Sequence, residues 1–465
     1  MEKFIDALEH GIVSFSNWIW GMPLLLLLTG GGLFFLIYSR FLPYRYFFHG
    51  VNVLRGKYDV RGPGQLSPYQ ALSTALASTV GMGNIAGVAV AISLGGPGAI
   101  FWMWVSAFVG MATNFFTCAQ ASMFRGKDSN GEIQGGPMYV IREGLGRAWK
   151  PLAYIFCFCC LFGTLSSFQA NQLTQAIINI GLVPMGVENN FTSKLAVGLV
   201  LTVVTAIVVL GGIQRIGNWA GKMVPIMIVL YFGSVVLILL MNIEAVPHYL
   251  KLIVTNAFTA ENYKGLPDPI TGGIVGGLIV LGVRRASFSN EAGIGTAPMA
   301  LGATKSVEPI REGLVAMLSP AIDTLIVCTC TALAILVTGV WQTSSDNGVL
   351  LTSTAFNSAF PGFGNYILMV CIFFFAITSL FSYCYYGNKS MSFMIGANRA
   401  HYYNYFYLAM IVVGAVASMT TIISLIDAAY AIMAFPTMIS GIILAPKVMK
   451  EAKSYFARMK AEGKL

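Results

Sequence analysis

Long apolar runs recur along the whole chain, and each is long enough to cross a lipid bilayer. The hydrocarbon core of a bilayer is about 30 Å thick, so a spanning helix needs about 20 apolar residues. Only 10% of the residues are charged and 56% are hydrophobic, whereas soluble domains carry about 25% charged residues. Such a chain cannot cover a water-facing surface, which excludes a soluble enzyme, a disordered chain and a nucleic-acid-binding protein. The expected fold class is an all-α polytopic membrane protein.

The apolar runs predict about 11 transmembrane helices within one transmembrane domain, 1–465. The predicted spans lie at about 17–39, 70–95, 98–123, 150–181, 194–211, 218–241, 270–302, 312–340, 364–386, 402–420 and 423–447. The gaps between these spans are too short to hold a water-soluble domain.

Basic residues are distributed unevenly between the two sides of this predicted bundle. Most of the 28 Lys and Arg residues lie in the tail or in loops that follow odd-numbered spans. The opposite side holds only Lys3, Lys194, Lys251 and Lys264. Because cytoplasmic loops are enriched in Lys and Arg, we expect a multi-pass protein of the plasma (inner) membrane, with its N-terminus outside and its C-terminal tail, 448–465, cytoplasmic. This topology explains the basic surplus without a nucleic-acid partner, and membrane lipid is the expected surrounding.

Two spans contain helix-breaking residues near the middle of the membrane. The second span carries Gly-Met-Gly-Asn at 81–84, and the seventh carries Phe-Ser-Asn-Glu-Ala-Gly at 288–293. Glycine weakens a helix by about 1 kcal/mol relative to alanine, and an unsatisfied peptide group in hydrocarbon costs several kcal/mol. The pattern therefore predicts opened helices, whose free N–H groups attract a carboxylate and whose free C=O groups attract a small cation. Tight packing through Gly83 and Gly87 is the alternative for the second span.

The two interrupted spans begin at corresponding places in two five-span halves, 70–241 and 270–447. Because five is odd, the second half enters the membrane from the opposite face. This arrangement is typical of inverted-repeat secondary transporters that bind substrate at the repeat interface, and it makes 17–39 an extra N-terminal helix. An intramembrane enzyme or a channel is the alternative from another class, although no nucleophile–base pair or metal-ligand cluster is visible.

The predicted spans contain Glu291, Asp323 and Asp427, and ionisable residues inside a membrane are functional candidates. Asp323 either senses an ion, pairs with Arg284 or Arg285, or caps a proline-broken turn. Asp427 is expected near the outer end of its span, where it reaches water. Glu291 is expected to form an ion pair with the neighbouring arginines or to act as a gate.

Two further spans carry polar side chains that suggest ligand binding. Gln169 and Gln172 lie three residues apart and so share a helix face, where an amide can hold a polar ligand or link two helices. Thr378 and Ser379 offer adjacent hydroxyls, which can coordinate Na⁺ or bond back to their own helix.

At these residues the chain resembles the alanine/glycine:cation symporter family, also called the sodium:alanine symporters. The resemblance covers nearly the whole chain and is carried by four motifs. They are Gly-Met-Gly-Asn-Ile-Ala-Gly-Val at 81–88, Gly-Gly-Pro-Gly-Ala-Ile-Phe-Trp-Met-Trp at 95–104, Gly-Gly-Pro-Met-Tyr at 135–139 and Phe-Ser-Asn-Glu-Ala-Gly at 288–293.

The resemblance implies a fold like that of the bacterial leucine transporter, with a 5+5 inverted repeat and two unwound helices. It also implies import of a small neutral amino acid, alanine or glycine, coupled to inward Na⁺ by alternating access. A glutamine-preferring or proton-coupled carrier is the alternative. No cofactor is expected besides Na⁺ as the coupling ion, and a monomer is expected.

The resemblance further implies which residues form the site. Substrate is expected to contact both broken helices and the fourth and ninth spans. The substrate-binding residues are Thr79, Met82, Gly83, Asn84, Gln169, Phe288, Ser289, Asn290, Gly293 and Tyr383. The sodium ligands are the carbonyls of Ala77 and Val80 and the hydroxyls of Thr378 and Ser379. Family members usually carry Thr in place of Met82 and Trp in place of Tyr383, so the preferred amino acid can differ here.

Overall fold

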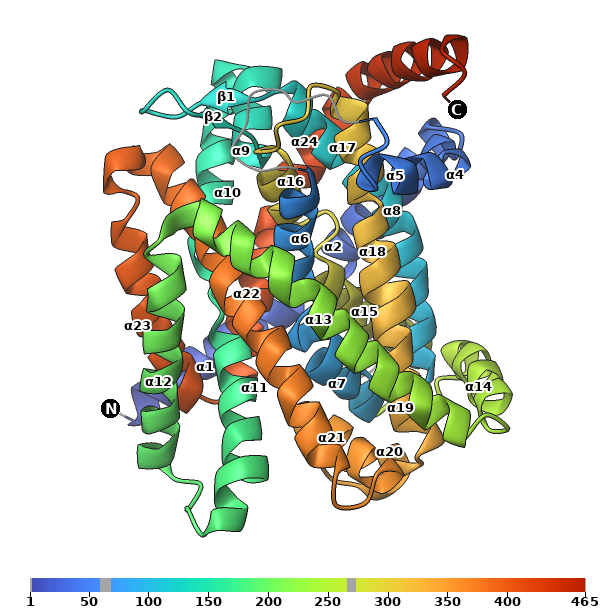
Figure 1. Ribbon diagram of the computed structural model, residues 1–465, viewed down its shortest axis with the longest axis vertical. Coiled ribbons are helices and arrows are strands. Elements are labelled where there is room, and N and C mark those ends of the chain that lie inside the picture. Colours follow the sequence, from blue (N-terminus) through green and yellow to red (C-terminus); the bar gives the residue numbers. More distant parts are fainter. Residues whose placement is uncertain (1, 59–67, 266–272, 465) are drawn as a thin grey trace.

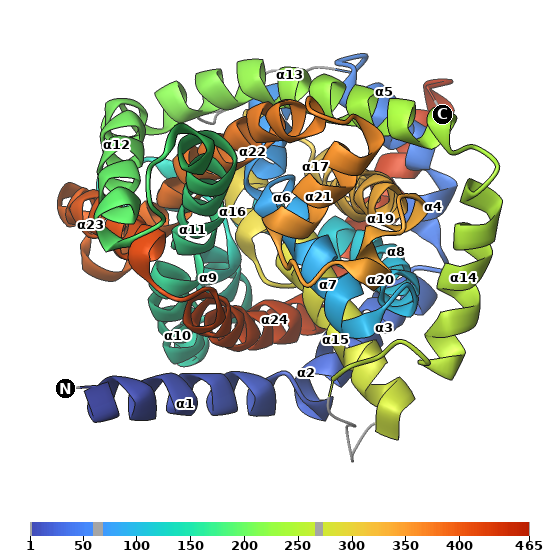
Figure 2. The ribbon, with the colours of Figure 1, turned by 90° about the horizontal axis from the view of Figure 1, so that it is seen from below.

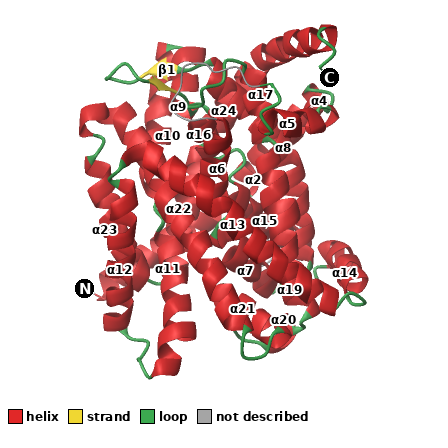
Figure 3. Cartoon of the chain, viewed as in Figure 1, coloured by secondary structure: helices red, strands yellow, loops and turns green. Residues whose placement is uncertain are grey.

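The computed structural model describes residues 2–58, 68–265 and 273–464, and it is almost entirely helical (Figure 3). Helices satisfy the backbone hydrogen bonds within each segment, which is what a lipid environment requires. Within these described ranges, seven helices are long and apolar enough to cross a membrane, and nine if each of two bent pairs counts as one span. The prediction of an all-α polytopic membrane protein is confirmed.

The first third of the chain forms the N-terminal helix, the first broken span and the helices that follow it. Its elements are α1 (Glu2–Ile19), α2 (Met22–Leu25), the π-helix η1 (Leu26–Gly30), α3 (Gly31–Tyr38), α4 (Leu42–Arg45), α5 (Phe47–Leu54), α6 (Pro68–Thr79), the π-helix η2 (Gly83–Gly87), α7 (Val88–Gly95), α8 (Gly98–Met123), β1 (Gly126–Lys127), β2 (Ile133–Gln134), α9 (Pro137–Tyr139), η3 (Val140–Leu145) and η4 (Arg147–Trp149). The strands β1 and β2 form a small antiparallel hairpin after α8, which was not predicted.

The middle of the chain completes the first half of the bundle. Its elements are α10 (Lys150–Gly163), α11 (Ser167–Ala176), η5 (Ile177–Leu182), η6 (Val183–Met185), α12 (Phe191–Val209), α13 (Gly212–Met241) and α14 (Val246–Thr259). The predicted span 150–181 is therefore interrupted between α10 and α11. The predicted gap 242–269 contains the helix α14.

The last part of the chain contains the second broken span and the remaining helices. They are α15 (Gly273–Asn290), α16 (Thr296–Leu301), α17 (Pro309–Ala316), α18 (Leu318–Pro320), the π-helix η7 (Ala321–Cys328), α19 (Thr329–Val337), α20 (Val340–Thr343), α21 (Val349–Ala359), α22 (Gly364–Ile395), η8 (Ala397–Arg399), α23 (Tyr402–Val416) and α24 (Met419–Ala461). The predicted span 402–420 corresponds to α23, which has only 15 residues. The last span is longer than predicted, because α24 continues to Ala461.

The first predicted span, 17–39, is not one straight helix. The segments Gly11–Ile19 and Met22–Tyr38 meet at a bend of 43°. Seen from below in Figure 2, α1 lies along one edge of the molecule, and it packs against α24.

The connecting segments are sorted between the two ends of the molecule. In Figure 1, the β1–β2 hairpin, α4, α5 and the C-terminus lie at the top, whereas α14, α20 and α21 lie at the bottom. The broken helix α6 lies in the interior, where it contacts α13, α16 and α22. This position places the first break among the helices that carry the other candidate site residues.

Candidate functional site

The first break separates α6 from η2. The two halves of this span meet at 43° across the residues between Thr79 and Gly83. The side chain of Asn84 takes the place of a helical acceptor here, because its Oδ1 accepts a hydrogen bond from the Gly81 N–H at 2.8 Å. The break is therefore held open by a side chain of its own segment.

The second break separates α15 from α16. Three of its residues have positive φ angles: Glu291 at 54°, Gly293 at 83° and Gly295 at 111°. Glycine adopts this region without strain, whereas a side chain such as that of Glu291 does so only where its surroundings fix it. The Asn290 side chain supports the turn, since its Oδ1 accepts from the Ala292 N–H at 3.0 Å.

Hydroxyl groups hold Glu291 at this turn. The carboxylate is fully buried and accepts hydrogen bonds from Thr296, Tyr383 and Tyr430. Tyr383 and Tyr430 come from α22 and α24, so the carboxylate links the second break to two other spans. The expected ion pair with the neighbouring arginines is wrong, because those arginines point elsewhere.

The two breaks meet in the interior of the molecule. A Cβ built on Gly83 would lie 3.3 Å from the Ser289 Cα and 3.5 Å from the Phe288 Cδ1. The Phe288 ring packs edge-on against Phe168 of α11, with ring centroids 5.1 Å apart. This close approach leaves little room for a side chain at position 83, and it places the glycine-rich segment against the polar end of α15.

Gln169 of α11 has an acceptor without a partner. Its side chain is 5% exposed, and within the described residues its Oε1 accepts no hydrogen bond. Gln172, by contrast, is used internally, because its Oε1 accepts from the Val349 N–H at 3.1 Å. Of the two glutamines that share this helix face, only Gln169 retains a free acceptor for a ligand.

The predicted sodium ligands are partly brought together. The Ser379 hydroxyl donates to the Ala77 carbonyl at 3.0 Å, and Val80, three residues further along the first broken span, is buried. A Cβ on Gly81 would lie only 2.5 Å from the Ser379 Oγ, so the absence of a side chain keeps this oxygen-lined spot open. Carbonyl and hydroxyl oxygens suit a hard cation, so the donor set fits Na⁺. Thr378 instead donates to the Phe374 carbonyl at 2.9 Å.

Other predicted site residues face different neighbours. Met82 is fully buried beside the first break, and the Thr79 hydroxyl donates to the Ala75 carbonyl at 3.0 Å within its own helix. Gly293 does not lie with Gly83, because a Cβ on it would meet Leu28 and Met438 at 2.8 and 3.1 Å.

The buried acidic residues have partners that the sequence did not reveal. Asp427 is fully buried and accepts from Arg284 Nε at 2.6 Å and Arg285 Nη2 at 2.7 Å, so the expectation that it reaches water is wrong. The suggested pairing of Asp323 with Arg284 or Arg285 is also wrong, because both arginines bind Asp427. Asp323 instead accepts from Asn84 Nδ2 at 2.6 Å.

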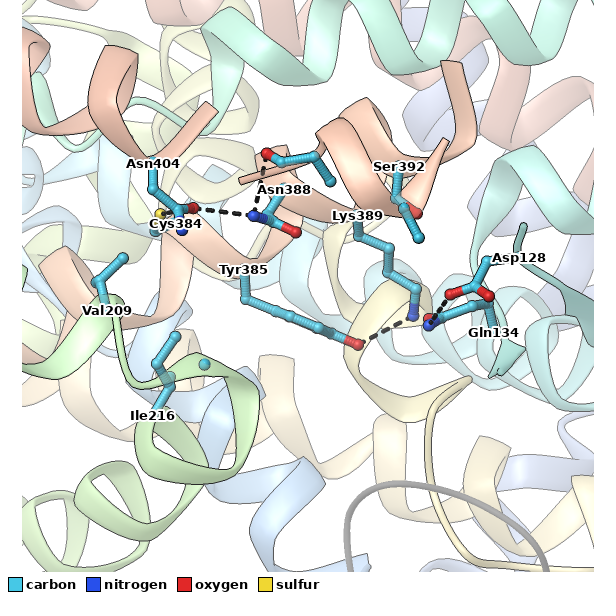
Figure 4. A pocket seen from close by; sticks show the side chains of 13 residues that line it. Asp128, Gln134, Val209, Ile216, Cys384, Tyr385, Asn388, Lys389, Ser392 and Asn404 are labelled. Atoms are coloured by element: carbon cyan, nitrogen blue, oxygen red, sulfur yellow. Dashed lines mark hydrogen bonds between the residues drawn. The ribbon is translucent and has the colours of Figure 1, made fainter. Parts of the chain in front are cut away.

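A separate pocket of about 190 Å³, lined by polar and apolar residues, lies at the end of the molecule that carries the β1–β2 hairpin (Figure 4). Within it, the buried Lys389 donates to the Met299 carbonyl at 2.7 Å and to the Tyr385 hydroxyl at 3.0 Å. Because Met299 belongs to α16, Lys389 links α22 to the second half of the broken span. None of the predicted site residues lines this pocket.

Several contributors to these networks were not expected from the sequence. Phe168 of α11 packs against Phe288, and Tyr430 of α24 donates to Glu291. Lys389 of α22 donates to the Met299 carbonyl. Lys389 was assigned to a loop because the hydropathy of its span declines after residue 386, although α22 continues to Ile395. No local signal distinguishes Phe168 or Tyr430 from other aromatic residues of the spans.

Comparison with known protein families matches residues 5–465 to the sodium:alanine symporter family. The chain belongs to this family. The symporter is 36% identical to the sodium/alanine symporter AgcS of Methanococcus maripaludis, over 97% of each chain. It is 34% identical to the probable sodium/glutamine symporter GlnT of Bacillus subtilis, over 99% of this chain and 93% of that protein. The protein is thus a multi-pass membrane transporter of the amino acid symporter class, and not an enzyme.

The fold of the symporter is also found among solved structures. It is similar to MhsT, crystallised in complex with L-phenylalanine, with a TM-score of 0.57 and 13% sequence identity. The match covers 84% of this chain and 98% of that one. The expected leucine transporter-like fold is confirmed.

Proposed function

We propose that the protein imports a small neutral amino acid, alanine or glycine, together with Na⁺ by alternating access. The observation that carries this proposal is the meeting of two broken helices at Gly83 and Ser289, deep inside the bundle. Half-helix ends at such a junction offer N–H groups to a carboxylate and C=O groups to a cation.

The residues divide into roles by their chemistry. The peptide groups around Met82 and Gly83 bind the substrate carboxylate at the first break. The free Gln169 Oε1 is an acceptor, and it suits the substrate ammonium group. Phe288, Ser289 and Asn290 contact the substrate at the second break. Met82, which is buried beside the first break, limits the size of the substrate.

Na⁺ binds between α6 and α22 in this proposal. The carbonyls of Ala77 and Val80 and the hydroxyl of Ser379 face it, after the Ser379 hydroxyl turns its hydrogen away from Ala77. Because Ser379 belongs to α22 and the carbonyls to the first broken span, the ion holds the two together. Thr378 joins the ligands only if its hydroxyl leaves the Phe374 carbonyl.

The topology of the proposal follows the basic residues. The end of the molecule that carries the hairpin, α4, α5 and the C-terminus in Figure 1 is the cytoplasmic one, and the N-terminus lies outside. The inverted repeats are 70–241 and 270–447, after an extra helix at 17–39 and before a tail at 448–465. The protein acts as a monomer in the plasma (inner) membrane.

Uptake of labelled alanine into proteoliposomes tests the proposal. We expect accumulation with an inward Na⁺ gradient and little uptake when K⁺ replaces Na⁺. Equal uptake under both conditions would reject sodium coupling. Competition by unlabelled glycine and glutamine decides between a small-substrate carrier and the glutamine-preferring alternative, which the similarity to a glutamine symporter keeps open. A proton gradient that drives uptake without Na⁺ would favour the proton-coupled alternative.

A further inference from the structure

The pocket near the β1–β2 hairpin contains two charged groups of opposite sign. Lys389 is 4% exposed and lines the pocket from α22, and Asp128 lines it from the loop between β1 and β2. Figure 4 shows the Lys389 side chain extending toward Asp128 and Gln134. In the part of the chain that the structure describes, neither charged group forms an ion pair. A buried ammonium group without a counter-charge carries a desolvation cost, which a negatively charged ligand group offsets.

The hydrogen bonds of these two groups leave each of them able to bind a ligand. Lys389 donates to the Met299 carbonyl and the Tyr385 hydroxyl, so its ammonium group keeps a third N–H. Asp128 Oδ1 accepts from two backbone N–H groups of the hairpin, whereas its Oδ2 accepts from the Gln134 amide at 3.2 Å. All of these partners are uncharged. The pocket therefore offers a ligand one positive and one negative group.

Gln134 adds an acceptor without a partner to this pocket. Its side chain is 9% exposed, and among the described residues its Oε1 accepts no hydrogen bond. The Gln134 Nε2 donates to Asp128, which places the free oxygen of the same amide close to the carboxylate. A buried acceptor without a donor carries a free-energy cost, which a ligand N–H group removes. One ammonium group of a ligand can thus satisfy both the Gln134 oxygen and the Asp128 carboxylate.

The size and position of the pocket suit a small ligand that arrives from water. Its volume is about 190 Å³, below the roughly 300–1,000 Å³ of pockets that hold drug-sized ligands. Asp128 and Ser392 in its lining are partly exposed, so the pocket opens at the end that the proposed topology places in the cytoplasm. The residues proposed for the substrate and Na⁺ at the helix breaks do not line it.

We propose that this pocket binds a second amino acid, in its zwitterionic form, from the cytoplasm. Lys389 binds the carboxylate, and Asp128 binds the ammonium group together with the Gln134 oxygen. Because both charges of the ligand are met by charges of the protein, this site needs no Na⁺, unlike the site at the helix breaks. The class of ligand rests on the proposed function, and the small volume favours an amino acid such as alanine or glycine.

A bound amino acid links α22 to the hairpin. Lys389 already joins α22 to α16, the second half of a broken span, through the Met299 carbonyl. The ligand therefore holds three elements of this end of the molecule together. Because a ligand that binds only the folded protein stabilises it, alanine should raise the melting temperature even where K⁺ replaces Na⁺.

The experiment measures the binding of labelled L-alanine to the purified protein in detergent, with K⁺ in place of Na⁺. We expect saturable binding that approaches about one alanine per protein molecule. Lys389→Met and Asp128→Asn each remove one charge, so we expect the affinity to fall at least about tenfold. The asparagine oxygen in Asp128→Asn still accepts from the hairpin backbone, which preserves the turn.

Two matched controls and two analogues sharpen this test. Lys453→Met and Glu132→Gln remove the same charges from exposed side chains outside the pocket, and they should bind alanine as the unmodified protein does. Propionate lacks the ammonium group of alanine and ethylamine lacks the carboxylate, so both should compete weakly. If propionate binds as tightly as alanine, the occupant is a simple anion and the amino acid is rejected.

The remaining outcomes separate this site from the proposed function. No binding of alanine without Na⁺, or unchanged binding in both charge-removing variants, would overturn the second site alone. If Gln169→Ala abolishes the Na⁺-free binding and Lys389→Met does not, alanine occupies the helix breaks and the second site is rejected. Na⁺-free binding that depends on Lys389, in a protein without Na⁺-driven uptake, would instead overturn the proposed function only. Should Lys389→Met fail to fold, unchanged binding in Asp128→Asn also rejects the site.

Discussion

Asp427 and Asp323 are both fully buried in spans, yet their surroundings differ in kind. Asp427 accepts from two arginines of α15, and the indole of Trp20 donates to its main-chain carbonyl at 2.8 Å. In the part of the chain that the structure describes, Asp323 accepts from hydroxyl and amide groups. The first carboxylate joins α24 to α15 through charges that the protein supplies. The second has uncharged donors only among the described residues, and it lies where two helices are broken.

The first prediction tests this difference by removing each charge in turn. Asp427→Asn leaves Arg284 and Arg285 without their anion, so we expect the free energy of unfolding to fall by about 3–5 kcal/mol. Asp323→Asn strands no cation, and it should cost no more than about 1–3 kcal/mol. Thermal and chemical unfolding of both variants in detergent checks the order. A larger loss in Asp323→Asn would contradict the view that the charged partners make Asp427 the more important carboxylate for stability.

The second prediction concerns the open space at the first break. Gly81→Ala places a methyl group against the Ser379 hydroxyl, so we expect the apparent Na⁺ affinity to fall at least about tenfold, equivalent to 1.4 kcal/mol. Gly233→Ala in α13 is the matched control, because a Cβ there meets no atom within 4 Å. The Na⁺ dependence of alanine uptake is measured for both. If Gly81→Ala leaves the apparent Na⁺ affinity unchanged, the space between Ala77 and Ser379 does not bind the transported ion.

A third prediction compares two glutamines on one helix face. Gln169→Ala removes the free acceptor, so we expect KM for alanine to rise about tenfold or more, since hydrogen bonds to charged groups contribute about 1.5–3 kcal/mol. Gln172→Ala should instead lower thermal stability with little change in KM, because it frees the Val349 N–H. Uptake kinetics and melting curves for the pair provide the measurement. The opposite pattern would place Gln172, and not Gln169, at the substrate.

The smallest effect is expected at Met82. Met82→Thr shortens a buried side chain beside the first break, so larger amino acids should gain relative to alanine. We expect the ratio of glutamine to alanine uptake to rise about tenfold, the lower end of the range that one methylene group provides in an apolar pocket. Competition uptake with both amino acids gives this ratio. An unchanged ratio would mean that Met82 does not face the substrate.

The sequence predicts the membrane-spanning helical class well, because a bilayer requires a minimum length and a high hydropathy of each span. It is less successful where helices bend or continue past the apolar core. The bend after Ile19, the interruption between α10 and α11 and the extension of α22 around Lys389 leave no clear mark in hydropathy. The candidate site shows the same division, since both breaks were found from glycines and polar residues but Phe168 and Tyr430 were not.

By itself, the sequence determined that this chain is a membrane-spanning helical protein with two interrupted helices, because hydropathy and helix-breaking residues act over short stretches of chain. Only the tertiary structure decided which charges meet. Arg285 bonds Asp427, 142 residues away, and Asn84 bonds Asp323, 239 residues away. The packing of the helices determines which residues meet at such separations, and local sequence patterns do not indicate it.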